Sequence, residues 1–419
     1  MRVSERGQRR PSGPREFFEV RPVSEALAGF RPARRSALES VGLNAALGRI
    51  PAEAIVSPHA LPGFTRATVD GFAVHAADTY GASEGMPSYL DLAGEALMGR
   101  PPEAQVRPGS AVAIATGAPL PPGADAVVMV EHTQAATSEL IEVLRPAAPG
   151  DGVVGADEDA AAGGPIARAG RALRAHDVGM LAAAGITELV VHARPRVAVV
   201  STGDELVPHD TAALAPGQVR DAIWPALAAL VREAGGEPVF AGIVPDDGEA
   251  LAHALRSPLR VSDLLVVSAG SSVGARDQTA AAIASLGEPG IWCHGLSVKP
   301  GKPTLLAEAG EVPVIGLPGN PRSALVVFRL IGVPLVRLVG GCVEPPPEPT
   351  VSARLARDLP SAAGRLDVVQ VRLEEGMATP LFGSSSLLSV LTAADGYLTV
   401  PEPATGLAAG SEVDVTLYR

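Results

Sequence analysis

Residues 195–340 alternate between short apolar runs and segments with helical character, and this alternation restricts the folds open to the chain more than any other feature. Four apolar runs have the length of a strand, and each is followed by a segment that favours a helix. This order predicts βαβ units and therefore an open parallel sheet with helices on both faces. The expected strands are 196–201, 238–244, 263–270 and 312–317, and the expected helices are 224–235, 247–256, 277–287 and one that begins near Pro321.

Different patterns flank this central domain. The N-terminal region, residues 20–194, opens with helical spacing and then predicts a mixed structure with a β-rich insertion at about residues 55–150. The C-terminal region, residues 346–419, follows a proline-rich linker and has short alternating runs that predict a small β-sandwich or barrel. Residues 1–19 are rich in Arg and lack an apolar core, which indicates a disordered tail rather than a signal peptide.

Composition excludes several classes of protein. A formal net charge of −12 argues against a general binder of nucleic acid or of membrane surfaces. The most apolar candidate for a membrane span, residues 323–340, is interrupted by Arg329, Pro334 and Arg337. Two cysteines are too few for a disulfide framework or a zinc knuckle and fit a reducing compartment. We therefore expect a cytoplasmic protein with no nucleic-acid or membrane partner.

Polar turns follow all four expected strands. They read STGDE (201–205), PDD (245–247), SAGSSVGARD (268–277) and LPGNP (317–321). Because the carboxyl ends of parallel strands share one edge of the sheet, and ligands bind there, the four turns should form one site.

Each turn alone also has a simpler structural interpretation. The SAGSSVG turn is either an ordinary Gly/Ser connection or a turn whose backbone N–H groups face a phosphate. The LPGNP turn, taken singly, is more typical of a helix-capping segment. Their shared position at one edge favours nucleotide binding, and the residues then expected to contribute are Ser271, Ser272, Gly274, Pro318, Gly319 and Asn320.

Several carboxylates lie on the same edge. Carboxylates beside phosphate-binding turns indicate Mg²⁺, which takes oxygen ligands from protein and substrate. Helix capping is the alternative, and it suits Asp247 better than Asp204, which directly follows a buried strand. The carboxylates that could serve such a metal are Asp204, Glu205, Asp246, Asp247 and Asp277.

Lys299 and Lys302, in the segment VKPGKP, are the only lysines, whereas the other 32 basic residues are arginine. Chance is one explanation. The other is that these positions need a compact ammonium group, which a planar guanidinium cannot replace. Phosphate and similar oxyanions are frequent targets of such a charge. The residues together predict a metal-assisted site for an oxyanion and a nucleotide phosphate.

With these motifs in hand, the chain resembles the molybdopterin molybdenumtransferase (MoeA) family, whose relatives include the C-terminal half of gephyrin. The resemblance covers nearly everything after the tail, and the motifs occur in family order. They are TVDGFAV (68–74), ATGAPLPPGADAVVMVEHT (115–133), STGDEL, GQVRD, GIVPDD, SAGSSVG, VKPGKP, GLPGNPRSAL, GRLDVVQVRL (364–373) and LFGSSSLLSVLTAADGYLTVPE (381–402).

The resemblance implies a reaction and the residues that take part in it. The family inserts molybdenum from molybdate into adenylylated molybdopterin, with Mg²⁺, and releases AMP. The resemblance implies that Asp204 and Glu205 lie near the metal and the pterin. It also implies that Asp246 and Asp277 belong with the nucleotide and metal loops, with Asp246 as a further metal ligand. Asp70 and Thr116 would face the sheet domain of the other subunit of a homodimer, and Arg365 would contribute from the C-terminal domain. The residues expected to act in catalysis are Asp70, Asp204, Glu205, Lys299 and Lys302.

The chain departs from the family pattern at several positions. The sheet loop reads AGSSVG where the family has GGVSVG. Asp221-Ala222-Ile223 stands where the family often has a polar Asp-Ser-Asn or Asp-Thr-Asn. Substrate affinity or route of entry would differ at these points.

Two other functions fit part of the pattern. A molybdopterin adenylyltransferase shares the sheet domain, but the long N-terminal and C-terminal regions argue against it. A non-catalytic scaffold or metal sensor is opposed by the intact VKPGKP and STGDE motifs.

Overall fold

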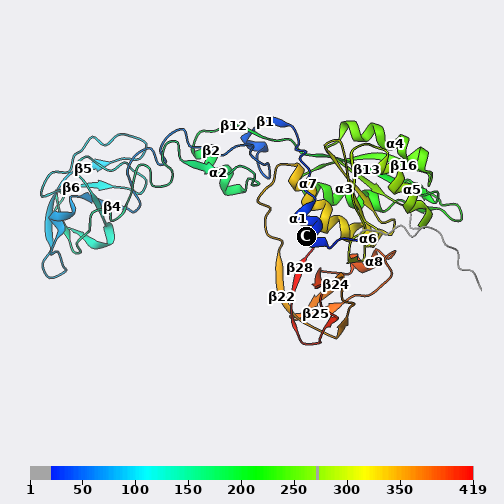
Figure 1. Ribbon diagram of the computed structural model, residues 1–419. Coiled ribbons are helices and arrows are strands. Elements are labelled where there is room, and N and C mark those ends of the chain that lie inside the picture. Colours follow the sequence, from blue (N-terminus) through cyan, green and yellow to red (C-terminus); the bar gives the residue numbers. More distant parts are fainter. Residues whose placement is uncertain (1–19, 270–272, 419) are drawn as a thin grey trace, which may run out of the picture.

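The computed structural model describes residues 20–269 and 273–418 and has an elongated shape (Figure 1). A β-rich lobe, called here the distal lobe, lies at one end, and a linking region joins it to the central α/β domain at the other end. A C-terminal barrel lies beside the central domain (Figure 1). The chain therefore runs outward from the central domain to the distal lobe and back before it builds the sheet.

The central domain contains a six-stranded sheet of order β16-β13-β17-β21-β20-β18. The first four strands are parallel, as predicted, and the last two are antiparallel. The antiparallel edge is an addition to the prediction, because its short strands lie among Gly and Pro residues that favour turns. The bounds are β13 (Arg196–Thr202), β16 (Glu237–Val244), β17 (Leu264–Ser268), β18 (Pro289–His294), β20 (Leu305–Ala309) and β21 (Val312–Leu317).

Helices cover both faces of this sheet, which confirms the predicted layers. Successive residues of β13 point to opposite faces, so Val197 and Val199 belong to one apolar core and Ala198 and Val200 to the other. The first core includes residues of α1 (Val23–Gly29), α3 (Ile223–Glu233), α6 (Pro321–Val327) and α7 (Val333–Val339). The second core includes residues of α4 (Gly248–Val261) and α5 (Val273–Ala284).

Helix boundaries follow local capping chemistry. Asp247 accepts a 2.8 Å hydrogen bond from the Ala250 N–H at the start of α4, as predicted for an N-cap. Pro321 occupies the first turn of α6, where its missing N–H costs nothing. A π-helical segment, η4 (Phe328–Gly332), connects α6 to α7, so the long predicted helix has one irregular turn.

The distal lobe contains a six-stranded sheet of order β7-β4-β6-β5-β9-β8 with an apolar core on each face. It confirms the predicted β-rich insertion. Its strands are β4 (Gly71–Val74), β5 (Ser88–Ala96), β6 (Ser110–Ile114), β7 (Ala126–Met129), β8 (Thr133–Ala135) and β9 (Leu140–Val143); its 3₁₀ turns are η2 (Ala76–Thr79) and η3 (Val130–His132).

The linking region is a ribbon in which the outgoing chain pairs with the returning chain. Three antiparallel strand pairs form it, and α2 packs beside them. Its elements are β1 (Leu38–Gly42) with β12 (Glu188–His192), β2 (Ile55–Val56) with β11 (Pro165–Ala167), β3 (Arg66–Ala67) with β10 (Val153–Val154), η1 (Leu43–Ala45) and α2 (Ala175–Ala183).

The C-terminal domain is a barrel, so the structure decides between the two predicted alternatives. Pairing between β24 and β26 closes the ring. A short strand from the central domain, β19 (Val298–Lys299), adds to β24 and joins the two domains. The elements of this domain are β22 (Thr350–Leu355), β23 (Leu359–Pro360), β24 (Leu366–Glu374), β25 (Met377–Pro380), α8 (Ser389–Thr392), β26 (Gly396–Val400), β27 (Gly406–Leu407) and β28 (Glu412–Leu417). In the central domain, β14 (Leu206–Val207) and β15 (Val219–Arg220) form a separate parallel pair.

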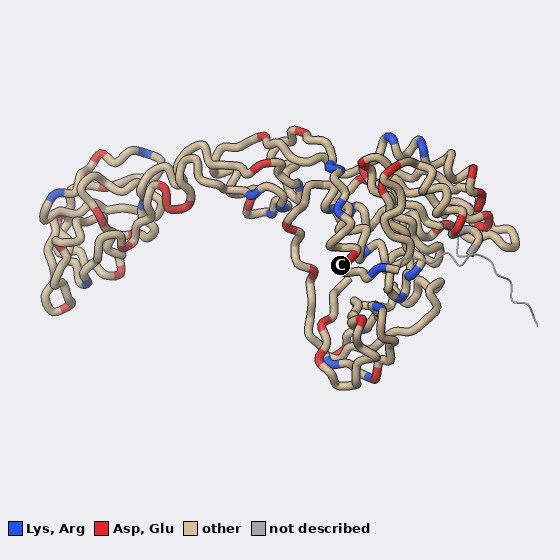
Figure 2. The backbone as a smooth tube through the Cα atoms, in the orientation of Figure 1, with Lys and Arg blue, Asp and Glu red and all other residues tan. Residues whose placement is uncertain are grey.

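Charged residues of both signs occur along the whole molecule, in the distal lobe, the linking region, the central domain and the barrel (Figure 2). None of the helices in the described ranges combines the length and the apolar character that a membrane span requires.

Candidate functional site

The turns after the parallel strands lie at one edge of the sheet, as predicted. The strand register places Thr202 opposite Val244, and Ser201 opposite Ser268. Ser268 in turn lies opposite Leu317, where the LPGNP turn begins. Ser271 and Ser272 lie outside the described residues, whereas Gly274 and Asp277 lie on the first turns of α5, where Asp277 is exposed.

Three carboxylates gather on the turns after β13 and β16. The Asp246 N–H donates a 3.1 Å hydrogen bond to Asp204 Oδ1, which ties the two turns together. Partial burial raises the pKa of Asp246, and the negative charges of Glu205 and Asp204 raise it further, against a hydrogen bond from Thr202. We call Asp204, Glu205 and Asp246 the carboxylate cluster.

The chemistry of this cluster suits a hard cation. Crowded carboxylates repel one another, and a divalent cation with oxygen ligands relieves that repulsion. Among the described residues, no group of three or more His, Cys, Asp or Glu side chains is arranged to hold a metal ion by itself. Mg²⁺ characteristically takes one or two carboxylates and completes its shell with water and substrate phosphate, so the cluster fits that ion as a partial ligand set.

A cavity of about 500 Å³ opens at the other end of the same edge, between the central domain and the barrel. Four basic side chains line it: Lys299, Lys302, Arg322 and Arg365. Its one carboxylate, Asp367, already accepts a 2.7 Å hydrogen bond from Arg365 Nε. We call this the cation cavity. In a chain with a net charge of −12, it is a local site of positive charge, which is what an anion requires.

The loop that carries the two lysines is held rigidly. β19 pairs with β24 in the register Lys299 to Asp367. Gly301 has a φ of +121°, and a Cβ there would lie 2.1 Å from Val327 Cγ2, so only glycine lets the loop approach α6 so closely. Both lysines are exposed, and within the described ranges neither ammonium group has an ion-pair partner. Their charges are therefore available to a ligand.

Asn320 and Pro318 line the cation cavity too, from the turn that begins α6. Gly319 lies between them in the same turn. The structure thus brings the LPGNP turn, both lysines and Arg365 together. It adds Arg322, which sequence reasoning missed because its hydrogen-bonding partners, Gln370 and Gly383, lie 48 and 61 residues further along.

Asp70 and Thr116 form a separate pair in the distal lobe. Asp70 Oδ1 accepts hydrogen bonds from the Thr116 N–H at 2.7 Å and from Thr116 Oγ1 at 2.9 Å. These bonds, the backbone one first, lower the pKa of Asp70. Gly71 allows the close strand packing beside them, since a Cβ there would lie 1.9 Å from the Val128 carbonyl oxygen. The distal lobe lies at the opposite end of the molecule from the sheet edge (Figure 1), so one chain does not join this pair to the site.

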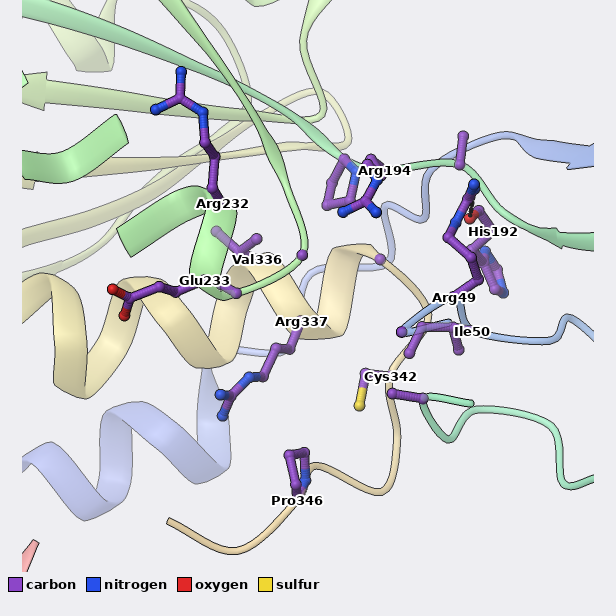
Figure 3. Close-up of a pocket in the computed structure, with 17 residues that line it drawn as sticks. Arg49, Ile50, His192, Arg194, Arg232, Glu233, Val336, Arg337, Cys342 and Pro346 are labelled. Atoms are coloured by element: carbon purple, nitrogen blue, oxygen red, sulfur yellow. Dashed lines mark hydrogen bonds between the residues drawn. The ribbon is translucent and has the colours of Figure 1, made fainter. Parts of the chain in front are cut away.

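A second cavity, of about 320 Å³, lies where the linking region meets the central domain, and it has a different character. Arg49 there is paired with Glu39, and Arg337 donates a 3.2 Å hydrogen bond to Glu348. Arg232 and Arg337 point in opposite directions (Figure 3). Arg49 and Arg337 of this cavity are thus paired, whereas the lysines of the cation cavity have no ion-pair partner among the described residues.

The fold and the site define a multi-domain α/β protein that has carboxylate turns and a cavity lined by basic side chains on one edge of its parallel sheet. Three family models match in chain order: the MoeA N-terminal region (domains I and II) at 21–185, a probable molybdopterin-binding domain at 198–338, and the MoeA C-terminal region (domain IV) at 352–418. The chain belongs to the molybdopterin molybdenumtransferase (MoeA) family, whose members are transferases of molybdenum cofactor biosynthesis.

Individual relatives agree with this assignment. Molybdopterin molybdenumtransferase 2 of Mycobacterium tuberculosis is 34% identical, over 94% of this chain and 97% of the relative. Molybdopterin molybdenumtransferase of Bacillus subtilis is 31% identical, over 95% of this chain and 94% of the relative. A crystal structure of a molybdopterin biosynthesis MoeA protein from Pyrococcus horikoshii superposes with a TM-score of 0.80 at 31% identity and covers 96% of this chain and 100% of that one.

Proposed function

We propose that the protein inserts molybdenum from molybdate into adenylylated molybdopterin and releases AMP, with Mg²⁺ as cofactor. The observation that carries this proposal is the cation cavity, because four basic side chains face one carboxylate that is already paired. Molybdate is a small tetrahedral dianion with the shape and charge of phosphate, so it suits two compact ammonium groups held by a rigid loop.

The two ends of the sheet edge then have separate tasks. Lys299 and Lys302 bind the oxyanion at the cation cavity. The carboxylate cluster lies at the other end, after β13 and β16. The nucleotide part of the substrate binds along the turns between the carboxylate cluster and the cation cavity. Mg²⁺, when bound, would neutralise charge on the phosphate oxygens, and Asp204, Glu205 and Asp246 are the residues that would hold it.

The site is completed by a second copy of the chain. Asp70 and Thr116 hold each other in a fixed geometry in the distal lobe, far from the sheet edge of their own chain (Figure 1). A homodimer in which the distal lobe of one subunit faces the sheet edge of the other would bring the pair to the reaction. The described cysteines are both free and buried, and we place the reaction in the reducing cytoplasm on that ground.

Turnover of purified protein with adenylylated molybdopterin, molybdate and Mg²⁺ tests the proposal. We expect AMP release and molybdenum cofactor formation to rise together with molybdate concentration. Formation of adenylylated molybdopterin from molybdopterin and ATP would instead identify an adenylyltransferase. Binding of molybdate without any turnover would identify a scaffold or sensor.

A further inference from the structure

Arg322 is the buried member of the cation cavity. It is 8% exposed, whereas both lysines of the cavity are exposed. It lies in the first turn of α6, directly after the LPGNP turn, and it lines the cavity. Its backbone N–H also donates a 3.1 Å hydrogen bond to the Ser385 carbonyl oxygen of the C-terminal domain. Its position is therefore fixed from both domains.

Neutral groups orient the guanidinium of Arg322. Nε donates to Gln370 Oε1 at 2.8 Å, Nη2 donates to the same oxygen, and Nη1 donates to the Gly383 carbonyl oxygen at 2.8 Å. A guanidinium has five N–H donors, and these contacts use three of them. One N–H on each terminal nitrogen is left for a further acceptor.

In the described part of the chain, no carboxylate forms an ion pair with Arg322, and burial lowers the pKa of its guanidinium. A buried charge without a counter-charge is costly, and buried arginines are ordinarily paired. Among the described residues one other arginine is buried, Arg49, and it is paired with Glu39. Two arginines with small exposed fractions, Arg329 and Arg337, pair with Glu348.

We propose that Arg322 binds the oxyanion of the cation cavity directly and that this oxyanion supplies its missing counter-charge. Gln370 and Gly383 hold the guanidinium so that its two remaining N–H groups are presented to the ligand. This inference rests on the proposed function for the identity of the ligand, a tetrahedral oxyanion that is either molybdate or the phosphate of the nucleotide.

Gln370→Glu is the decisive variant. The side chain keeps its size and its acceptor oxygen for Arg322, so the contact between the domains is preserved or strengthened. It also gives Arg322 a carboxylate, which competes with the oxyanion for the charge. Arg322→Met removes the charge outright. Gln105→Glu, at an exposed position of the distal lobe, is the matched control because it changes the net charge of the chain by the same amount.

The measurement is calorimetric titration of each full-length variant with sodium molybdate and, separately, with AMP and Mg²⁺, with thermal melting as the control for folding. We expect Gln370→Glu and Arg322→Met to weaken binding of one oxyanion about tenfold or more, the scale of one charge-assisted hydrogen bond. Gln105→Glu should bind as wild type. The titrant that loses affinity identifies whether Arg322 serves molybdate or the nucleotide phosphate.

Wild-type affinity of Gln370→Glu for both titrants would overturn the inference, even if Arg322→Met lost binding, because Arg322 would then act only as a structural clamp. Wild-type protein that binds neither titrant would overturn the inference and the oxyanion site together. Arg322-dependent binding without any cofactor formation would leave the inference standing and remove the proposed function alone.

Discussion

Lys299 and Lys302 have a clear geometric reason to differ from the other 32 basic residues of the chain. They lie on one rigid loop, have no ion-pair partner in the described ranges, and line one cavity. A compact ammonium group can approach a small tetrahedral anion from many directions, whereas a guanidinium is a larger planar fork.

Lys299→Arg and Lys302→Arg should therefore each impair molybdate-dependent turnover although charge is kept. A misplacement of donors by about 1 Å can cost about a hundredfold in rate. Lysine-to-alanine variants should lose at least as much. Molybdate-dependent turnover is the measurement, and Arg100→Lys, at an exposed position of the distal lobe, is the control expected to change stability by less than about 0.5 kcal/mol. Wild-type activity of both lysine variants would mean that ammonium groups are not required here.

At the scale of elements, the start of α2 depends on one ion pair. Asp177 accepts 2.8 Å hydrogen bonds from the Arg174 N–H and from Arg174 Nε, so it ties the residue before the helix to the first helical turn. The side-chain hydrogen bond from Arg174 is the largest cause that lowers the pKa of Asp177 to about 2, from 3.8. A lowered carboxyl pKa means that the charged form stabilises the folded state, and that this contribution is lost as pH falls.

Asp177→Asn should lower the melting temperature at neutral pH because the helix cap is weakened. The free energy of unfolding should fall by about 1 kcal/mol or less, since the ion pair is partly solvated. The difference from wild type should be fully present above pH 3.8 and should shrink as pH falls toward about 2. Calorimetric melting at a series of pH values measures it. A difference that grows on acidification would contradict this account of the pair.

Two helical glycines should respond to alanine in opposite directions. At Gly332, in η4, a Cβ would lie 2.2 Å from the ring of Phe328, which is fully buried. Gly332→Ala should therefore destabilise the protein by about 1–3 kcal/mol through overpacking. At Gly179, in α2, nothing lies within 4 Å, so alanine should stabilise the helix by up to about 1 kcal/mol. Thermal melting of both variants is the measurement, and a shift of equal sign in the two would contradict the packing argument.

At the scale of the whole molecule, the elongated shape separates groups that the proposed reaction uses together. Asp70 and Thr116 lie in the distal lobe, and the cation cavity lies between the central domain and the barrel (Figure 1). A shared site in a symmetric dimer resolves this separation. Light scattering at micromolar concentration should then give twice the chain mass, whereas an active monomer would refute the shared site.

Complementation is a stricter test of the same arrangement. Asp70→Ala and Lys302→Ala homodimers should each be inactive. A mixed dimer has one site in which both substitutions meet and one intact site, so subunits exchanged at random should recover about a quarter of wild-type activity. No recovery after exchange, with mixed dimers demonstrated by mass, would show that each chain uses its own Asp70.

Local patterns in the sequence were sufficient for the parallel sheet and its binding edge. The period of apolar residues reports which face of an element is buried, and polar turns at strand ends must meet when the strands are parallel. The strands 196–201 and 312–317 were predicted within a residue of their observed bounds, and the Asp247 cap was predicted from one residue type.

Only the tertiary structure decided features that join distant segments. The closure of the barrel by β24 and β26, the addition of β19 to β24, and the contact of Arg322 with Gln370 all depend on partners that no local pattern names. The sequence by itself determined which residue types could bind an oxyanion, because their chemistry is carried by the side chains. Long-range packing settled which of them converge, and it buried Arg322 among them with no ion-pair partner in the described ranges. The free energy of these contacts exists only once both segments are in place.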